Sequence, residues 1–405
     1  MSKELRPLEP ALEELLGLIG AVSDTETVNT MDAAGRVLAQ DVRSAINVPP
    51  MDNSQMDGYV VRAADVSDGA KLTVSQRIPA GQVGTPLARG TAARIFTGAG
   101  IPADADAVIA QEDVTVDGDT ITLGSAPTAG AWVRQCGEDI AADSVILPAG
   151  TRLSAQAIGL AASVGLPELQ VRRRLRVACF FTGDELVMPG EPLRPGAIYN
   201  SNRFMLVSLL RELGCDVTDL GIVADSLDAT RQALRAAAAD NDLIVTSGGV
   251  SVGEEDHVKP AVEAEGELRL WQLNIKPGKP FAYGQIRRES AGVAHFVGLP
   301  GNPVSSFVTF LLLVRPLLLR LAGATETGVR AVSLTADFTL PRPDRRREFL
   351  RARINDAGRL ELFPNQSSAV LTSTVWAHGL IDNPPGGAIE PGQTVRFLPF
   401  AELMS

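Results

Sequence analysis

The chain is poor in the residue types from which many metal and redox sites are built. Its 405 residues include only three cysteines and three histidines, and aromatic side chains make up 5%. The cysteines, Cys136, Cys179 and Cys215, have no CxxC spacing, so the sequence predicts neither a disulfide framework nor a zinc site. The histidines are too scattered for a His-rich metal cluster. A reducing, cytoplasmic environment fits this composition.

The chain also lacks a basic excess and a membrane-spanning run. It has 37 Lys and Arg against 48 Asp and Glu, which argues against a nucleic-acid partner. Its first residues, MSKELRPLEP, contain no apolar run, so we expect no signal peptide. The most apolar segment, Phe307 to Leu321, carries Arg315, Pro316 and Arg320. It is too short and too charged to span a bilayer, and we expect a buried core helix and no membrane association.

What the sequence does contain is a change of pattern along its length, which predicts several domains. Residues 1–47 and 141–174 read as helical and extended segments of one N-terminal domain, and residues 48–140 read as a small β domain inserted into it. Residues 175–323 alternate strands with helices, which predicts a parallel, doubly wound sheet. Residues 324–405 return to strands and are expected to form a barrel-like β domain. The predicted fold class is therefore α/β multidomain.

One glycine turn has the features of a phosphate site. The segment Asp242 to Lys259, DLIVTSGGVSVGEEDHVK, reads as a buried strand that residues 247–249 interrupt. Two adjacent glycines can aim successive N–H groups at one anion, and Ser251 adds a hydroxyl. The carboxylates at 254–256 would repel a phosphate unless a cation such as Mg²⁺ lay between them. The alternative is an ordinary turn followed by a solvated acidic face, because the spacing matches neither the Walker nor the dinucleotide pattern.

Two later segments also favour anions. In IKPGKP, Lys276 and Lys279 flank a stiff turn, so that two ammonium groups lie near one another. In VGLPGNPVSS, Asn302 is a suitable N-cap and Pro303 a suitable first helical residue, which presents a helix N-terminus to an anion.

These segments should meet at one edge of the sheet. Thr182 to Glu185, Asp225 and the glycine turn all follow predicted strands. Ligands of doubly wound sheets bind beyond the carboxyl ends of the strands. We therefore expect the binding site there.

The inserted β domain has polar loops of its own. Asn47 to Val60, NVPPMDNSQMDGYV, reads on composition as a turn-rich linker, but Asp52, Ser54 and Asp57 could also be metal or substrate ligands. Further polar loops follow at Thr97 to Gly100 and at Arg134 to Asp139.

Eight motifs in order resemble the molybdopterin molybdenumtransferase family, which includes the gephyrin-type E domain. They are PPMDNSQMDGY, ARIFTGAGIPADADAVIAQED, GED, FFTGDEL, NSNRFML, TSGGVSVGEED, KPGKPFAYG and GLPGNPVSSF. The resemblance implies a Mg²⁺-dependent enzyme that inserts molybdate at the dithiolene sulfurs of adenylylated molybdopterin and releases AMP. It also implies an elongated homodimer of four-domain subunits.

The resemblance also assigns roles to individual residues. The implied catalytic residues are Asp57, Asp139, Glu185, Asp225, Asp256, Lys276 and Lys279. The implied contacts to the molybdopterin substrate are Thr97, Thr182, Ser247, Gly248, Gly249, Ser251, Pro300, Asn302 and Pro303. Asp256, Glu185 and Asp225 are the implied Mg²⁺ ligands. Asp57, Thr97 and Asp139 come from the inserted domain, so the active site is expected to be shared across the dimer.

Other partners and activities are compatible with the same motifs. Molybdopterin adenylyltransferase and molybdoenzyme maturation proteins are candidate partners. An adenylyltransferase-like activity is one alternative, although such a chain would lack the N-terminal region. A non-catalytic carrier or scaffold is another, although it would be expected to lose the carboxylates. Molybdate and tungstate fit the motifs equally.

The sequence departs from the family pattern at several positions. Asn200 stands where Asp is frequent and His257 where Tyr is common. The segment after Gln366, SSAVLTSTVWAHGL, lacks the usual glycines and carries Trp376 and His378. We expect all these changes to lie outside the core of the site.

Overall fold

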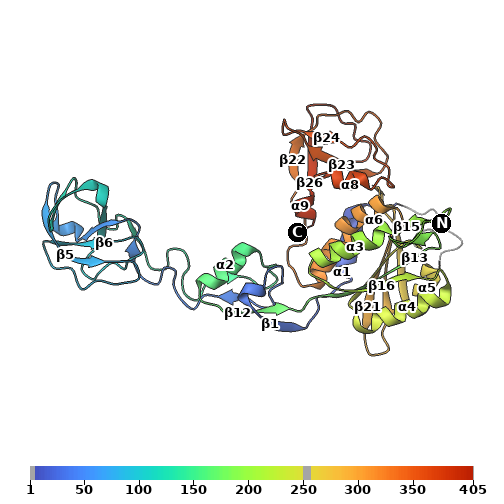
Figure 1. Cartoon of the computed structure of the whole chain (residues 1–405), viewed down its shortest axis with the longest axis horizontal. Helices are drawn as coiled ribbons and strands as arrows, with labels where there is room; N and C mark the ends of the chain where they lie inside the picture. The colour runs from blue at the N-terminus through green and yellow to red at the C-terminus, as the bar shows by residue number, and fades with distance from the viewer. Residues whose placement is uncertain (1–4, 250–256, 405) are drawn as a thin grey trace.

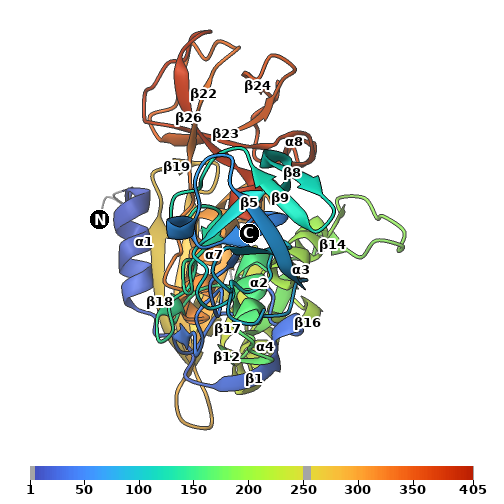
Figure 2. The ribbon, with the colours of Figure 1, turned by 90° about the vertical axis from the view of Figure 1, so that its left-hand side faces the viewer.

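The chain forms an elongated body with four regions. The computed structural model describes residues 5–249 and 257–404. A small β domain lies at one end, a middle region follows, and the α/β domain lies at the other end with the C-terminal domain beside it (Figure 1). Viewed along the long axis, the C-terminal domain rises to one side of the α/β domain (Figure 2). The predicted α/β multidomain fold is confirmed.

The α/β domain is built on a six-stranded sheet. In spatial order its strands are β16 (Asp216–Val223), β13 (Arg176–Thr182), β17 (Leu243–Ser247), β21 (Val293–Leu299), β20 (Pro280–Arg287) and β18 (Gly266–Gln272). The first four are parallel, but β20 is antiparallel to both of its neighbours. The predicted parallel, doubly wound sheet is therefore confirmed for these four strands, and β20 departs from the parallel pattern. The short connection 288–292 between β20 and β21 cannot make a parallel crossover.

Helices cover both faces of this sheet, as expected for a doubly wound fold. One face packs against α1 (Leu8–Gly17), α3 (Ser201–Glu212), α6 (Pro303–Thr309) and α7 (Arg315–Leu321). The other packs against α4 (Leu227–Asp240) and α5 (Val258–Glu265). The alternation of β13 explains this, because Cys179 and Phe181 face the first layer whereas Ala178 and Phe180 face the second.

The most apolar helical run lies inside the core. By length and composition Pro303–Leu321 could span a membrane, with a mean hydropathy of 1.8, but 94% of it is buried within the fold. This confirms the predicted core helix. A π-helical turn, Phe310–Val314, interrupts it just before Pro316, where the missing proline N–H breaks the α-helical hydrogen-bond ladder.

The middle region combines two separated segments of the chain. Strand β1 (Thr25–Asn29) pairs with β12 (Glu168–Arg172), and β2 (Val42–Arg43) pairs with β11 (Val145–Leu147). Helix α2 (Ala155–Ser163) covers them, and the Ser154 hydroxyl accepts a hydrogen bond from the Ala157 N–H, as predicted for its N-cap. Helix α1 lies elsewhere. It packs against α7 in the α/β core, although the sequence grouped residues 1–47 with the middle region.

The inserted domain is a compact β body. Its six-stranded sheet has the order β7 (Ala107–Ala110), β4 (Gly58–Val61), β6 (Thr91–Ile95), β5 (Lys71–Ile78), β9 (Thr120–Leu123) and β8 (Val114–Asp117). A short pair, β3 (Asn53–Ser54) with β10 (Val133–Arg134), lies beside it.

The C-terminal domain takes one strand from the α/β domain. Its sheet has the order β19 (Ile275–Lys276), β23 (Arg347–Ile354), β25 (Gly379–Asn383), β26 (Thr394–Pro399) and β22 (Val332–Thr335), with β24 (Leu360–Leu362) paired to β23. The two-residue strand β19 runs parallel to β23 and thereby joins the two domains. Two short helices, α8 (Thr372–Trp376) and α9 (Phe400–Leu403), complete it.

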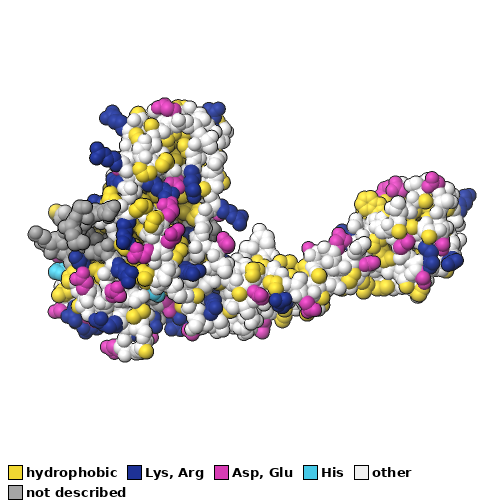
Figure 3. All heavy atoms as spheres, turned by 180° about the vertical axis from the view of Figure 1, so that it is seen from behind, with side chains coloured by type: hydrophobic (Ala, Val, Ile, Leu, Met, Phe, Trp, Pro, Cys, Tyr) yellow, Lys and Arg dark blue, Asp and Glu magenta, His cyan; other side chains and the backbone are white. Residues whose placement is uncertain are grey.

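The surface carries charges of both signs. On the face in Figure 3, acidic and basic side chains are interspersed along the elongated body and do not gather into one large basic field. This distribution agrees with the net charge of −11.

Candidate active site

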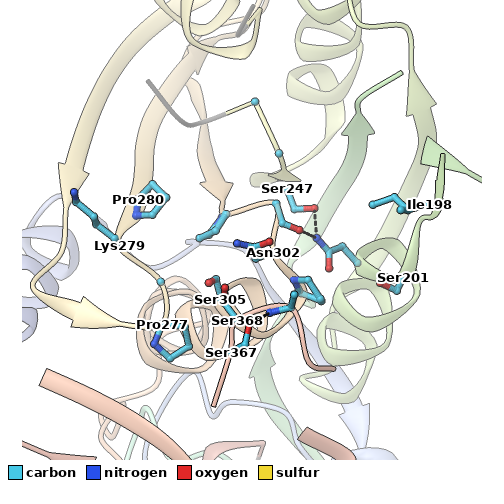
Figure 4. A pocket seen from close by; sticks show the side chains of 18 of the residues that line it. Ile198, Ser201, Ser247, Pro277, Lys279, Pro280, Asn302, Ser305, Ser367 and Ser368 are labelled. Atoms are coloured by element: carbon cyan, nitrogen blue, oxygen red, sulfur yellow. Dashed lines mark hydrogen bonds between the residues drawn. The ribbon is translucent and has the colours of Figure 1, made fainter. Parts of the chain in front are cut away.

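A large cavity lies where the carboxyl ends of β13, β17 and β21 meet the C-terminal domain. Its volume is about 1050 Å³. Ten of the residues singled out from the sequence line it: Thr182, Glu185, Ser247, Gly248, Gly249, Lys276, Lys279, Pro300, Asn302 and Pro303. Several of these side chains are seen together in Figure 4. The structure therefore brings together the three anion-favouring segments, at the edge of the sheet where the strand order predicted them.

The glycine turn after β17 forms one wall of the cavity. Gly248 and Gly249 have φ values of +91° and +62°, which side chains rarely allow. The Gly248 N–H donates to the Leu299 carbonyl at 3.0 Å, so this N–H serves the fold and not a ligand. Ser251 and Asp256, which the sequence also placed at this site, lie outside the described residues.

Asn202 connects the turn after β17 with the loop after β21, and it was not singled out from the sequence. Its Nδ2 donates to Ser247 Oγ at 3.1 Å and to the Gly301 carbonyl at 2.8 Å. Its Oδ1 is buried on the cavity wall and accepts no hydrogen bond from the described residues. An unpartnered buried acceptor is costly unless a ligand donates to it. The NSN motif was the available signal. Asn200 caps α3, so Asn202 lies in the first turn of the helix, next to the strand ends.

The two lysines of the KPGKP turn have different surroundings. Lys276 Nζ lies 3.1 Å from Glu348 Oε1 and 3.3 Å from Asp344 Oδ2, both in the C-terminal domain. Glu348 is almost fully buried, so this ion pair fastens the two domains. Lys279 forms no ion pair with any described residue and lies at one side of the cavity (Figure 4). Its charge is therefore available to an anionic ligand.

The carboxylates are less closely grouped than the sequence suggested. Glu185 is exposed on the cavity wall, and its side chain folds back over Gly183. Asp225 is half-buried behind the wall, where it accepts a hydrogen bond from Thr182 Oγ1 at 3.0 Å. Within residues 5–249 and 257–404, no group of three or more His, Cys, Asp or Glu side chains could hold a metal.

Three predicted residues lie in the inserted domain, far along the chain body from this cavity. Asp57 accepts hydrogen bonds at 2.8 Å from both the N–H and the hydroxyl of Thr97. These bonds hold the pKa of Asp57 below its usual value, so it is ionised at neutral pH. Asp139 is exposed in a neighbouring loop, and its N–H donates to Val48. The inserted domain that carries these residues, marked by β5 and β6, lies at the opposite end of the body from the α/β domain (Figure 1).

The C-terminal domain supplies a wall of the cavity, which the sequence reading missed. Arg346, Gln366, Ser367 and Ser368 line it. The Ser368 carbonyl accepts the Val304 N–H of α6 at 3.0 Å, so this amide of the predicted helix N-terminus is already bonded. The loop is held from behind, because the Gln366 amide donates to the Arg351 and Phe363 carbonyls.

The expectation that departures from the family pattern lie outside the site is thus partly wrong. Ser367 and Ser368, which stand where the resemblance implies glycines, line the cavity wall, and Asn200 also lines the cavity while its Oδ1 caps α3. Trp376 and His378 do lie away from it. Trp376 packs against Phe363, and His378 Nδ1 accepts the Ile354 N–H.

The Gly278→Ala variant tests whether the lysine turn must hold its position. Gly278 has a φ of +102°, and a Cβ there would lie 2.3 Å from Thr309 Oγ1 on α6. We expect a loss of about 1–3 kcal/mol in the free energy of unfolding and a weaker affinity for anionic substrate. Chemical denaturation and substrate titration measure the two effects. A Gly292→Ala variant is the matched control, because it has a positive φ but no neighbour within 4 Å. Equal effects in both variants would contradict a role for the close packing.

Comparisons with known proteins cover the whole chain. Three family profiles match: the MoeA N-terminal region (domain I and II) over residues 6–165, a probable molybdopterin binding domain over 178–320, and the MoeA C-terminal region (domain IV) over 332–400. A molybdopterin molybdenumtransferase of Haemophilus influenzae is 40% identical over 98% of this chain and 99% of its own. One from Nostoc is 38% identical over 77% of this chain and 73% of its own.

A solved structure agrees with these sequence matches. The molybdopterin biosynthesis MoeA protein of Pyrococcus horikoshii superposes with a TM-score of 0.84 and 28% identity, covering 98% of this chain and 100% of that one. The similarity therefore extends to the arrangement of all the domains.

Proposed function

Because the chain belongs to the molybdopterin molybdenumtransferase family, we propose that it inserts molybdate into adenylylated molybdopterin in a Mg²⁺-dependent reaction that releases AMP. In this reaction a water molecule or a molybdate oxygen would attack the phosphoanhydride of the adenylylated substrate so that AMP leaves, and the two dithiolene sulfurs would replace oxygen ligands of the molybdenum, which leave as water or hydroxide. A cytosolic setting fits the three free thiols.

The large cavity beside the glycine turn is the observation that supports this proposal best. Its volume of about 1050 Å³ is at the upper end of ordinary ligand sites, which suits a substrate that joins a pterin to a nucleotide. Diphosphate and molybdate are both oxyanions. Lys279 offers them an ammonium group that no described residue pairs, and Arg346 and the loop with Ser367 and Ser368 line the cavity from the C-terminal domain. The unpartnered Asn202 Oδ1 is available to an N–H or O–H of the substrate.

Mg²⁺ is the cation that we assign to this site, and the described residues fit it. Mg²⁺ in phosphate sites uses one or two carboxylates together with phosphate oxygens and waters. Glu185 meets this requirement, because no described residue bonds its carboxylate. Asp225 supports the same loop through Thr182. The bound ion would supply charge neutralisation of the phosphates, while Lys279 holds the anion in place.

We propose that the site is completed by a second copy of the chain. The Asp57 carboxylate accepts two hydrogen bonds from Thr97 in the inserted domain, which lies at the opposite end of the body from the α/β domain and its cavity (Figure 1). A two-fold dimer would bring this pair, and Asp139 with it, to the cavity of the partner.

A reconstitution assay tests the transferase reaction and its metal. The chain, incubated with adenylylated molybdopterin, molybdate and Mg²⁺, should release AMP in step with active cofactor. AMP is measured by chromatography and the cofactor by activation of a cofactor-free molybdoenzyme. EDTA should reduce both at least about tenfold, and added Mg²⁺ should restore them. Equal AMP release without divalent cations would contradict the metal requirement, and no AMP under any condition would contradict the reaction.

A further inference from the structure

A second, smaller cleft lies between the middle region and the α/β domain, at the crossing from β12 to β13. Five arginines line it: Arg36, Arg152, Arg172, Arg173 and Arg174. The other side is formed by the end of α3 with Cys215 and by apolar side chains of α7, including Leu318 and Leu319. So many guanidinium groups at one junction are unexpected in a chain with a net charge of −11.

Only two of the five arginines pair with carboxylates, and because Arg173 pairs with two, the five guanidinium groups face three carboxylates and two positive charges remain. Arg36 pairs with Glu26, and Arg173 pairs with Asp24 and Asp242. The other three form no ion pair with any carboxylate in the described parts of the chain; each donates to backbone carbonyls instead. Arg152 Nε donates to Gly35 at 3.4 Å, Arg172 Nη1 to Val22 and Ser23 at 3.1 Å, and Arg174 Nη1 to Gly214 at 3.0 Å.

No side chain of the cleft supplies the missing negative charge. Cys215 lies beside Arg152, but burial raises the pKa of its thiol to about 12, so it is neutral at physiological pH. Burial also lowers the pKa of Arg152, which means that its positive charge is partly removed from water. Like charges held together under partial desolvation repel one another unless an anion lies between them.

The size of the cleft limits the anion. It has about 30 Å³ of space for the centres of water-sized groups, which admits roughly two of them. Two of the four oxygens of a tetrahedral oxyanion fit this space while the other two stay at the mouth of the cleft, whereas a nucleotide or a pterin does not fit. Guanidinium groups bind such oxygens through paired, parallel N–H donors.

We propose that this cleft binds one small tetrahedral dianion of the phosphate class, held by Arg152, Arg172 and Arg174. Arg152 and Arg172 belong to the middle region, whereas Arg174 leads into β13 and contacts the end of α3. A bound anion would therefore fasten the elongated arm to the α/β domain. Phosphate, sulfate and molybdate share this chemistry, and the proposal does not depend on the proposed function.

The test is thermal unfolding of the full chain in chloride and in phosphate, sulfate or molybdate at matched ionic strength. A ligand that binds only the folded state should raise the melting temperature by about 2–4 °C at millimolar concentration. In a Lys279→Ala background, where the anion site of the large cavity is weakened, Arg152→Gln should abolish this rise without lowering the melting temperature in chloride, because it also relieves the repulsion. Arg235→Gln, which changes an exposed arginine paired with Glu265, should keep the rise.

The Lys279→Ala variant distinguishes the arginine cleft from the anion site of the large cavity. This variant alone should keep a phosphate-dependent rise in melting temperature. A rise that persists in the Lys279→Ala, Arg152→Gln double variant, or the absence of any anion-dependent rise in Lys279→Ala alone, would overturn the proposal. If Arg152→Gln fails to fold, Arg174→Gln replaces it, since that guanidinium is exposed and contacts one carbonyl. Calorimetric titration with phosphate and with molybdate then shows whether a general cellular anion or the oxyanion substrate is preferred.

Discussion

An equimolar mixture of Asp57→Ala and Lys279→Ala chains should regain about one quarter of the wild-type rate of AMP release after subunit exchange, although neither variant alone should exceed about one tenth of that rate. Asp57 lies in the inserted domain and Lys279 on the large cavity. In a shared site, one chain supplies Asp57 and its partner supplies Lys279. When the two variants mix at random, about half of the dimers contain one chain of each kind. One of the two sites in such a dimer has both residues, which gives the expected fraction.

The control for this experiment pairs two variants of the same cavity. Glu185→Ala and Lys279→Ala should not complement one another, because both residues belong to one chain's wall and no mixed dimer contains an intact site. Native mass spectrometry verifies that subunits have exchanged. Full activity of a chain shown to be monomeric, or a mixture of the Asp57 and Lys279 variants that exchanges but stays inactive, would rule out the shared site.

The second large effect is expected from Lys279→Ala alone. A hydrogen bond to a charged group contributes about 1.5–3 kcal/mol, so we expect a fall of about 10- to 100-fold in kcat/KM for the adenylylated substrate. The remaining affinity should depend less on salt, because one charge contact is gone. The melting temperature should stay unchanged, since no described residue pairs with this ammonium group.

Lys276→Ala is the matched comparison, because Lys276 lies in the same turn as Lys279 but is already paired with Asp344 and Glu348. It leaves the buried carboxylate Glu348 without its cationic partner, and this should reduce the free energy of unfolding by about 1–3 kcal/mol. Denaturant melts and initial rates distinguish the two variants. A Lys279→Ala chain that is less stable but binds substrate normally would show that Lys279 stabilises the fold and does not bind substrate.

Much of the site could be predicted because its residues follow strands of one sheet. Once Thr182, Ser247 and Pro300 are placed at the carboxyl ends of parallel strands, the sheet itself brings them together. The N-cap at Ser154 could be predicted for a similar reason, since it is a local property of a few residues.

The parts that the sequence did not predict depend on contacts between distant segments. Nothing near Ser367 and Ser368 indicates that their loop packs on the start of α6, because that contact is a backbone hydrogen bond to Val304. Similarly, the pattern around Lys276 does not reveal Glu348 as its partner 72 residues later. The residues of β20 and of the edge strand β18 also do not indicate the direction of these strands, and only the length of their connections limits it.

The two-residue strand β19 has a consequence for how this protein could be divided or recombined. A cut of the gene near residue 324, where the sequence changes pattern, would not separate two self-sufficient modules. The α/β fragment would keep β19 as an uncovered edge, and the C-terminal fragment would lose a strand of its sheet. The Glu9 side chain, which pairs with Arg347, would lose its partner as well. The unit that can be inherited or exchanged as one piece is therefore the α/β domain together with its C-terminal neighbour.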